Sequence, residues 1–156
     1  EIEPGDWSSD VCSSDLIFGM NIAITGYGRI AKYTAQKLKQ LGAEVSIFAR
    51  NPVALTKAEN SGLKAHRLSD LIYYANTFDC IINTVPALII SDDIIKHTKT
   101  DVFLVETASA PYGIDFIAAE NSGRALHKAF SLPGKTAPKT AGIIIAQTIE
   151  QLLKEV

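Results

Sequence analysis

A glycine-rich turn near the start of the chain has the residue types and the spacing to hold a phosphate group. Residues 26–31, Gly-Tyr-Gly-Arg-Ile-Ala, follow an apolar run and precede a helical pattern. In a G-x-G-x-x-G/A turn, the first glycine permits the sharp bend, the second lets the backbone approach a pyrophosphate, and the last small residue lets helix and strand pack closely. The alternative is a turn that needs its glycines only for geometry. We predict a dinucleotide-binding turn whose cofactor contacts are Gly26, Tyr27, Gly28, Arg29 and Ile30.

The end of the second apolar run indicates which dinucleotide is bound. An NAD-binding unit usually carries Asp or Glu there, because a carboxylate accepts hydrogen bonds from the ribose hydroxyls. This chain has Arg50 and Asn51 instead. A guanidinium cannot accept a hydrogen bond, but it can bind a 2′-phosphate with two. We therefore predict NADP, contacted by both residues; NAD with a merely solvated Arg50 stays open.

Two further strand ends should reach the same edge. Pro86 stops the fourth apolar run, and we expect Thr84, Val85 and Pro86 to line the nicotinamide side of the cleft. Glu106 ends the next run. Its carboxylate is either an acid/base group or, as we favour, a structural cap of the following loop. No catalytic residue is assigned.

Residues 132–142, Leu-Pro-Gly-Lys-Thr-Ala-Pro-Lys-Thr-Ala-Gly, suit the binding of a carboxylate. Cations, hydroxyls and rigid prolines converge here directly before an apolar helix. We predict Lys135 and Lys139 as counter-ions, and Thr136 and Thr140 as hydroxyl donors. The alternative is solvated surface lysines, although cations at a helix start oppose the helix dipole.

The strands and helices that bring these loops together can be predicted from Ile17 onward. Short apolar runs alternate with helical stretches, as in parallel strands joined by crossover helices. We predict a Rossmann-type α/β domain over residues 17–156, a doubly wound parallel sheet of about six strands in three αβα layers. The expected strands are 21–25, 44–49, 64–68, 79–84, 101–106 and 125–129, and the expected helices 29–41, 52 to about 61, 70–75, 92–98, 115–122 and 137–155.

Residues 1–16 differ from the rest. They are polar, rich in Ser and Asp, and show no helical or strand periodicity, which is typical of a disordered tail. Residues 6–16 also look like a translated sequencing adapter. We expect this segment to lie outside the fold, and the domain to be truncated from a longer two-domain protein.

Composition narrows the function classes. The 156 residues are 47% hydrophobic, which suits one core, and 15 basic and 17 acidic residues are scattered along the chain, so no nucleic-acid or anionic-membrane surface is expected. No apolar run approaches the roughly 20 residues of a membrane span. Two cysteines make no disulfide framework, and the three histidines share no ligand spacing, so we expect a cytoplasmic protein without a metal site.

Four stretches together resemble the family of the A-type subunit of dipicolinate synthase: 26–31, 83–87, 108–116 and, most specifically, 132–142. The resemblance spans 21–156 and corresponds to the family's carboxyl-terminal half. Within it, Tyr112 stands where the family usually has glycine.

The resemblance implies an NADP(H)- or NAD(H)-binding Rossmann domain of an oxidoreductase. Such an enzyme forms dipicolinate from the dihydrodipicolinate-related product of the lysine branch during sporulation. It further implies a small dicarboxylate substrate, the flavoprotein-like B-type subunit of dipicolinate synthase as partner, and the mother-cell cytoplasm as location. This fragment alone is expected to bind nucleotide without turnover, and a homo-oligomer stays open.

Two other classes stay open. The cofactor domain of a D-2-hydroxyacid or shikimate-type dehydrogenase shares this frame, but a hydroxyacid dehydrogenase needs catalytic Arg, Glu and His. No Arg follows the fifth strand before Arg124, and His127 lacks an evident carboxylate partner. A non-catalytic nucleotide-binding module would give residues 133–142 no role.

Overall fold

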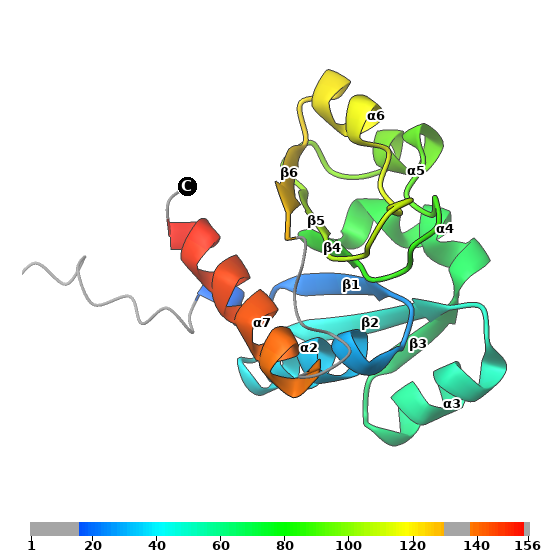
Figure 1. Cartoon of the computed structure of the whole chain (residues 1–156), viewed down its shortest axis with the longest axis vertical. Helices are drawn as coiled ribbons and strands as arrows, with labels where there is room; N and C mark the ends of the chain where they lie inside the picture. The colour runs from blue at the N-terminus through cyan, green and yellow to red at the C-terminus, as the bar shows by residue number, and fades with distance from the viewer. Residues whose placement is uncertain (1–15, 130–137, 155–156) are drawn as a thin grey trace, which may run out of the picture.

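Six parallel strands form one sheet in a computed structural model that describes residues 16–129 and 138–154. The sheet order is β3-β2-β1-β4-β5-β6 (Figure 1). Strands β2 and β3 are thus added on one side of β1 and strands β4 to β6 on the other, so the strand order reverses between β1 and β4. This reversal is the point where open α/β sheets bind ligands. The strands are β1 (Asn21–Thr25), β2 (Glu44–Ala49), β3 (Lys64–Arg67), β4 (Cys80–Asn83), β5 (Phe103–Glu106) and β6 (Ala125–Lys128).

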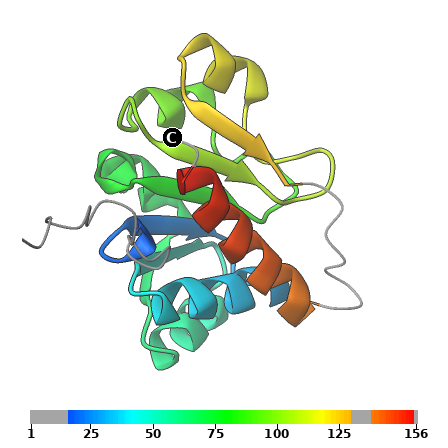
Figure 2. The same ribbon diagram turned by 90° about the vertical axis from the view of Figure 1, so that its left-hand side faces the viewer.

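Helices cover both faces of this sheet (Figure 2). One face carries α2 (Arg29–Gln40), α3 (Pro52–Asn60) and α7 (Pro138–Lys154). The other carries α4 (Leu71–Tyr74), α5 (Asp92–Lys96) and α6 (Phe116–Asn121), with 3-10 turns at Leu68–Asp70 and Ala75–Thr77. The predicted three-layer, doubly wound parallel fold is confirmed. Residues 1–15 of the segment expected to lie outside the fold are not among the described residues.

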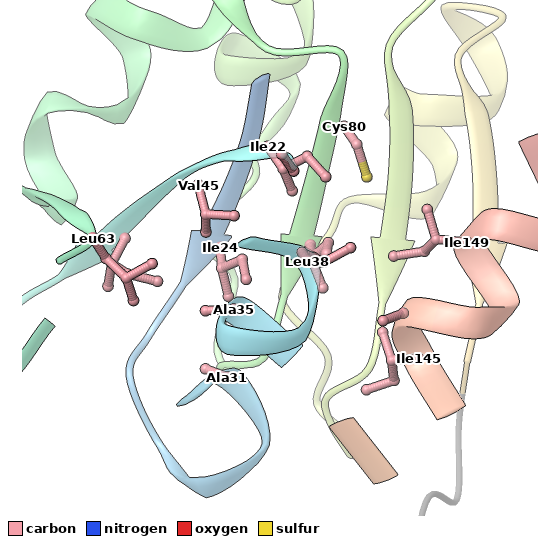
Figure 3. Close-up of a cluster of buried hydrophobic side chains, with 14 of the residues drawn as sticks. Ile22, Ile24, Ala31, Ala35, Leu38, Val45, Leu63, Cys80, Ile145 and Ile149 are labelled. Atoms are coloured by element: carbon pink, nitrogen blue, oxygen red, sulfur yellow. The ribbon is translucent and has the colours of Figure 1, made fainter. Parts of the chain in front are cut away.

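The sheet separates two apolar clusters, because buried parallel strands are apolar on both faces. Figure 3 shows the cluster that holds α2 against the sheet. In it, Ile24 of β1 lies with Ala35 and Leu38 of α2. Ile145 and Ile149 of α7 belong to the same cluster. Each of these side chains is at most 1% exposed, so α2 and α7 are fixed against the sheet.

Helices α2 and α7 approach each other closely at Gly142. A Cβ atom at this position would lie 2.7 Å from Tyr33 Cβ and 2.8 Å from Thr34 N. Only glycine therefore permits this crossing. The contact packs the second turn of α7 against the second turn of α2.

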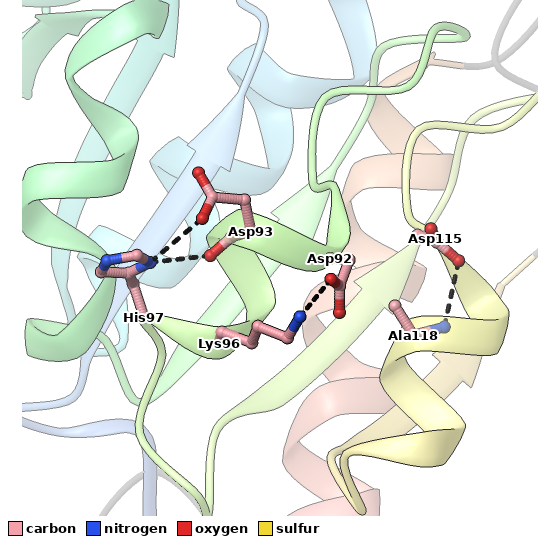
Figure 4. Close-up of polar contacts among 6 residues, drawn as sticks. All are labelled: Asp92, Asp93, Lys96, His97, Asp115 and Ala118. Atoms are coloured by element: carbon pink, nitrogen blue, oxygen red, sulfur yellow. Dashed lines mark hydrogen bonds and ion pairs between the residues drawn. The ribbon is translucent and has the colours of Figure 1, made fainter.

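The short helices on the other face are fixed locally. Asp115 caps α6, with its Oδ1 accepting a hydrogen bond from Ala118 N–H at 3.0 Å, and Lys96 forms an ion pair with Asp92 one turn earlier in α5 (Figure 4). The cap fixes the point at which the loop after β5 enters α6. None of the helices within the described ranges has the length and apolar character to cross a bilayer.

Asp79 ties together the opposite, amino edge of the sheet. Its Oδ2 accepts a hydrogen bond from Asn21 N–H at 2.8 Å, and its Oδ1 accepts one from Lys99 Nζ at 2.5 Å. Burial raises the pKa of the Asp79 carboxyl, but the hydrogen bonds from Lys99 and Asn21 outweigh burial and hold the pKa below its ordinary value of 3.8. The ionised form is therefore the one that stabilises the fold.

Replacing Asp79 with asparagine is expected to lower the midpoint of thermal unfolding near neutral pH. A depressed folded-state pKa contributes stability that is complete above about pH 5 and is lost as the pH falls through the folded value. The difference between wild type and Asp79→Asn should therefore close as the pH falls below the ordinary value of 3.8 and through the lower folded-state pKa. Thermal denaturation across pH 2–7 measures it, with exposed Asp101→Asn as control. A difference that stays constant with pH would contradict this account.

Candidate dinucleotide-binding site

The predicted cofactor residues meet at the carboxyl edge of the sheet. The loops after β1, β2 and β4 leave neighbouring parallel strands whose carboxyl ends lie side by side. Thr25, the last residue of β1, pairs with Phe48, the residue before the end of β2, and with Asn83, the last residue of β4. The structure thus brings residues 26–30, 50–51 and 84–86 to one edge, as the sequence patterns required. Their contacts with a cofactor stay a prediction.

Gly26 makes the sharp turn after β1. Its φ is +82°, in the left-handed region, and its N–H donates a hydrogen bond to Phe48 O at 2.8 Å. An added Cβ would lie 2.8 Å from Val85 Cγ2 and 2.9 Å from Thr84 Oγ1. Glycine is therefore required both for the backbone conformation and for the close approach of the loop after β4.

Gly28 leaves the start of α2 open. It is the N-cap of the helix, and no atom lies within 4 Å of the position that a Cβ would take. No side chain caps the helix, and its first turn carries no acidic residue. Free N–H groups beside an open glycine favour an anion, which fits the pyrophosphate of a dinucleotide. Ala31, fully buried, lets the helix pack closely on the sheet.

An open cavity of about 740 Å³ lies beside the end of β2. Arg50 lines it, together with Glu59 of α3 and Leu88 and Ile89 after β4. Arg67, the last residue of β3, lines it as well. Sequence analysis missed Arg67, because it treated this position as the interior of a strand running to 68. Its place at this edge follows only from its parallel pairing with Ala49, for which the sequence carries no local signal.

Asn51 is used by the protein itself. Its Oδ1 accepts a hydrogen bond from Val53 N–H at 2.9 Å, so the side chain caps α3. Thr84 is similarly engaged, since its hydroxyl donates to Thr25 O at 2.6 Å. Both residues lie where they were predicted to lie, with these side-chain groups holding the loops.

A row of buried polar residues joins three of the strand ends. Thr25, Asn83 and Glu106 are the last residues of β1, β4 and β5 and lie in register on one face. Thr25 Oγ1 donates a hydrogen bond to Asn83 Oδ1 at 2.6 Å, and Asn83 Nδ2 donates to Glu106 Oε1 at 2.7 Å. Sequence analysis missed the first two. Their signal was a polar residue closing each apolar strand.

The Glu106 carboxylate holds the loop that follows β5. Besides Asn83, its Oε1 accepts a hydrogen bond from Ala108 N–H at 2.8 Å. Its Oε2 accepts from Gly113 N–H at 2.7 Å and Ile114 N–H at 2.9 Å. The side chain is fully buried. Four donors around two buried oxygens make Glu106 a structural cap, the role favoured from the sequence.

Tyr112 adopts a conformation that favours glycine. Its φ is +64°, and it is the only non-glycine residue in the described ranges with a positive φ. Its ring packs against that of Phe116 in a tilted arrangement, with centroids 5.3 Å apart. The loop thus keeps the left-handed backbone that glycine would adopt with less strain, while the tyrosine side chain gains an aromatic contact.

Two of the four predicted substrate residues can be located. Lys139 and Thr140 lie exposed in the first turn of α7, which the contact at Gly142 places beside α2. Lys135 and Thr136 lie outside the described residues. Over the described ranges, no three His, Cys, Asp or Glu side chains gather as metal ligands.

Comparison with known proteins gives one family match, described as D-isomer specific 2-hydroxyacid dehydrogenase, NAD binding domain, over residues 1–113. A putative 2-hydroxyacid dehydrogenase of Schizosaccharomyces pombe is 27% identical over 124 residues, which are 77% of this chain and 36% of that protein.

The A-type subunit of dipicolinate synthase from Bacillus subtilis is 34% identical over 140 residues, which are 90% of this chain and 47% of that protein. The crystal structure of the same subunit from Bacillus halodurans superposes with a TM-score of 0.73 at 35% identity, covering 88% of this chain and 47% of that one. The chain therefore spans about half the length of these relatives. The resemblance inferred from residues 26–142 is confirmed. This chain belongs to the family of NAD-binding domains of D-isomer specific 2-hydroxyacid dehydrogenases, with the A-type subunit of dipicolinate synthase among its relatives.

Proposed function

We propose that this chain is the NADP-binding part of an oxidoreductase of the dipicolinate synthase type. The observation that carries the proposal is the combination of an uncapped α2 start beside open Gly28 with Arg50 at the end of β2. The first suits a pyrophosphate, and the second suits a 2′-phosphate. The carboxylate that would select NAD by binding the ribose hydroxyls is replaced by Arg50 at the position after β2.

A small dicarboxylate related to dihydrodipicolinate is the proposed substrate. Support comes from the similarity to dipicolinate synthase and from the position of Lys139 and Thr140, exposed in the first turn of α7, the helix that crosses α2 at Gly142. Lys135 and Thr136 are proposed to complete this site. A flavoprotein-like B-type subunit is the proposed partner, because the names of the relatives mark each of them as one lettered subunit of the synthase. Formation of dipicolinate during sporulation, in the mother-cell cytoplasm, is part of the same proposal.

Isothermal titration of the 156-residue chain with NADPH and with NADH tests the cofactor proposal. NADPH should bind more tightly than NADH. Arg50→Ala should lower the affinity for NADPH about tenfold or more, equivalent to roughly 1.4 kcal/mol of binding free energy, because the 2′-phosphate loses a charged bidentate partner. The affinity for NADH should stay unchanged. If the folded chain binds neither dinucleotide, the proposal is wrong. If Arg50→Ala lowers the affinities for NADPH and NADH equally, Arg50 does not contact the 2′-phosphate.

A D-2-hydroxyacid dehydrogenase is the second candidate, favoured by the family match. Such an enzyme needs a catalytic arginine after the fifth strand, facing the cofactor. Arg124 instead precedes β6, and its guanidinium donates to Ser122 O at 2.9 Å and Thr98 O at 3.2 Å. This position is the amino edge of the sheet, opposite the cofactor loops. Oxidation of a 2-hydroxy acid by the full-length enzyme would favour this candidate over the first.

A further inference from the structure

We infer that Arg67 is a second anchor for the 2′-phosphate of NADP, and that the cavity at the carboxyl ends of β2 and β3 discriminates NADPH from NADH through two guanidinium groups. The inference rests on the proposed function. It assigns a specificity role to a residue of β3, a strand in which sequence analysis placed no ligand contact.

Strand register places Arg67 beside Ala49, the residue before Arg50. Arg67 pairs with Ala49 in parallel, and neighbouring strands lie about 4.8 Å apart. Register partners project from the same face of a sheet. Ala49 is buried in the cluster that includes α2 and α3, so Arg67 projects toward the α3 side of the sheet. Arg50 follows Ala49 directly, and both arginines line the one cavity.

Neither arginine is neutralised by the protein. Within residues 16–129 and 138–154, Arg50 and Arg67 form no side-chain hydrogen bond and no ion pair. Other basic side chains nearby are engaged: Lys64 forms an ion pair with Glu44 at 2.9 Å, and Lys39 Nζ donates to Gly62 O at 2.7 Å. The two arginines are therefore available to a ligand.

Charge and shape of the cavity fit a phosphorylated nucleoside. Two guanidinium groups and the Glu59 carboxylate leave one net positive charge among its lining residues. Like charges on one cavity repel each other, and a phosphate monoester, which carries close to two negative charges at neutral pH, relieves this repulsion. Leu88, 63% exposed, and Ile89 supply an apolar wall against which a base can pack.

Replacing Arg67 with alanine in the 156-residue chain tests the inference. NADPH, NADH and adenosine 2′,5′-bisphosphate are titrated separately. Arg67→Ala should lower the affinities for NADPH and for the bisphosphate tenfold or more, while the affinity for NADH stays within twofold of the wild-type value. Because Arg67 is exposed, the variant should keep its circular dichroism spectrum and unfolding temperature.

Lys64→Ala is the matched control. It removes the same charge from the same strand, about 10 Å away at the other end, where Lys64 lines no part of this cavity. Its affinity for all three ligands should equal that of wild type. If Lys64→Ala and Arg67→Ala lower the affinity for NADPH equally, the loss comes from the change in overall charge and not from a contact with Arg67, and the inference is wrong.

One outcome separates the inference from the proposed function. If NADPH binding is weakened by Arg50→Ala but not by Arg67→Ala, Arg67 has no anchoring role and the proposed cofactor stands. If wild type binds NADPH and NADH equally, the inference and the proposed preference for NADP both fail, while dinucleotide binding stands. If the folded chain binds neither, the proposed function fails and the inference fails with it.

Discussion

Replacing Gly26 with alanine is expected to abolish dinucleotide binding and to lower the free energy of unfolding by about 2 kcal/mol. The φ of +82° strains any residue with a Cβ, and the new atom would lie within 2.9 Å of both Val85 Cγ2 and Thr84 Oγ1. Because the Thr84 hydroxyl holds Thr25 O, relief of the overlap must move the turn or the loop after β4. For a chain of this size the unfolding midpoint should fall by roughly 4–8 °C.

Gly28→Ala is the matched variant, since it adds the same methyl group two residues later. Gly28 has a φ of −77° and open space where the Cβ would go, so stability should not change. Binding should still weaken, because the methyl group occupies the space through which a pyrophosphate approaches the α2 start. Differential scanning fluorimetry and titration with NADPH measure the two effects. Wild-type affinity in Gly28→Ala would show that this turn is structural only.

How far the sequence predicted this fold depended on what marks each element. The first two strands match at both ends, because an apolar run closes at Gly26 in one case and before the Asn51-Pro52 helix start in the other. The fifth strand was predicted from 101 but begins at Phe103. No glycine or proline marks its amino end. A hydrophobic pattern shows which residues are buried, but not where the hydrogen bonds of the sheet begin. Val102 is fully buried without belonging to the strand.

The polar row could not be predicted, because it depends on register. Thr25 and Asn83 are 58 residues apart, and Asn83 and Glu106 are 23 apart. In parallel strands that are apolar on both faces, alternation does not fix which residues lie side by side. The same ambiguity concealed Arg67, whose place beside Arg50 follows only from its pairing with Ala49. Motifs local in sequence were predictable, whereas constellations assembled across strands were not.

Glu106→Gln is expected to destabilise the fold by about 3 kcal/mol, a fall of roughly 6–12 °C in the unfolding midpoint. The amide group would replace one carboxylate oxygen and point its own N–H groups at two donors. These are either the Asn83 amide and Ala108 N–H, or Gly113 N–H and Ile114 N–H. Asn83 cannot turn to compensate, because its Oδ1 already accepts from Thr25 and Val85. Two buried donors thus lose their acceptor.

Glu120→Gln is the control, the same chemical change at an exposed site whose contact with Lys128 Nζ spans 3.8 Å. Its stability should change by less than about 0.5 kcal/mol. Thermal denaturation of both variants, with NADPH titration at a temperature where each is folded, separates the two roles of Glu106. A structural cap predicts lower stability together with weaker binding, because residues 107–114 lose their anchor beside the cofactor edge. Full stability in Glu106→Gln, with loss only of turnover in the full-length enzyme, would instead make Glu106 an acid/base group and contradict the hydrogen-bonded cap.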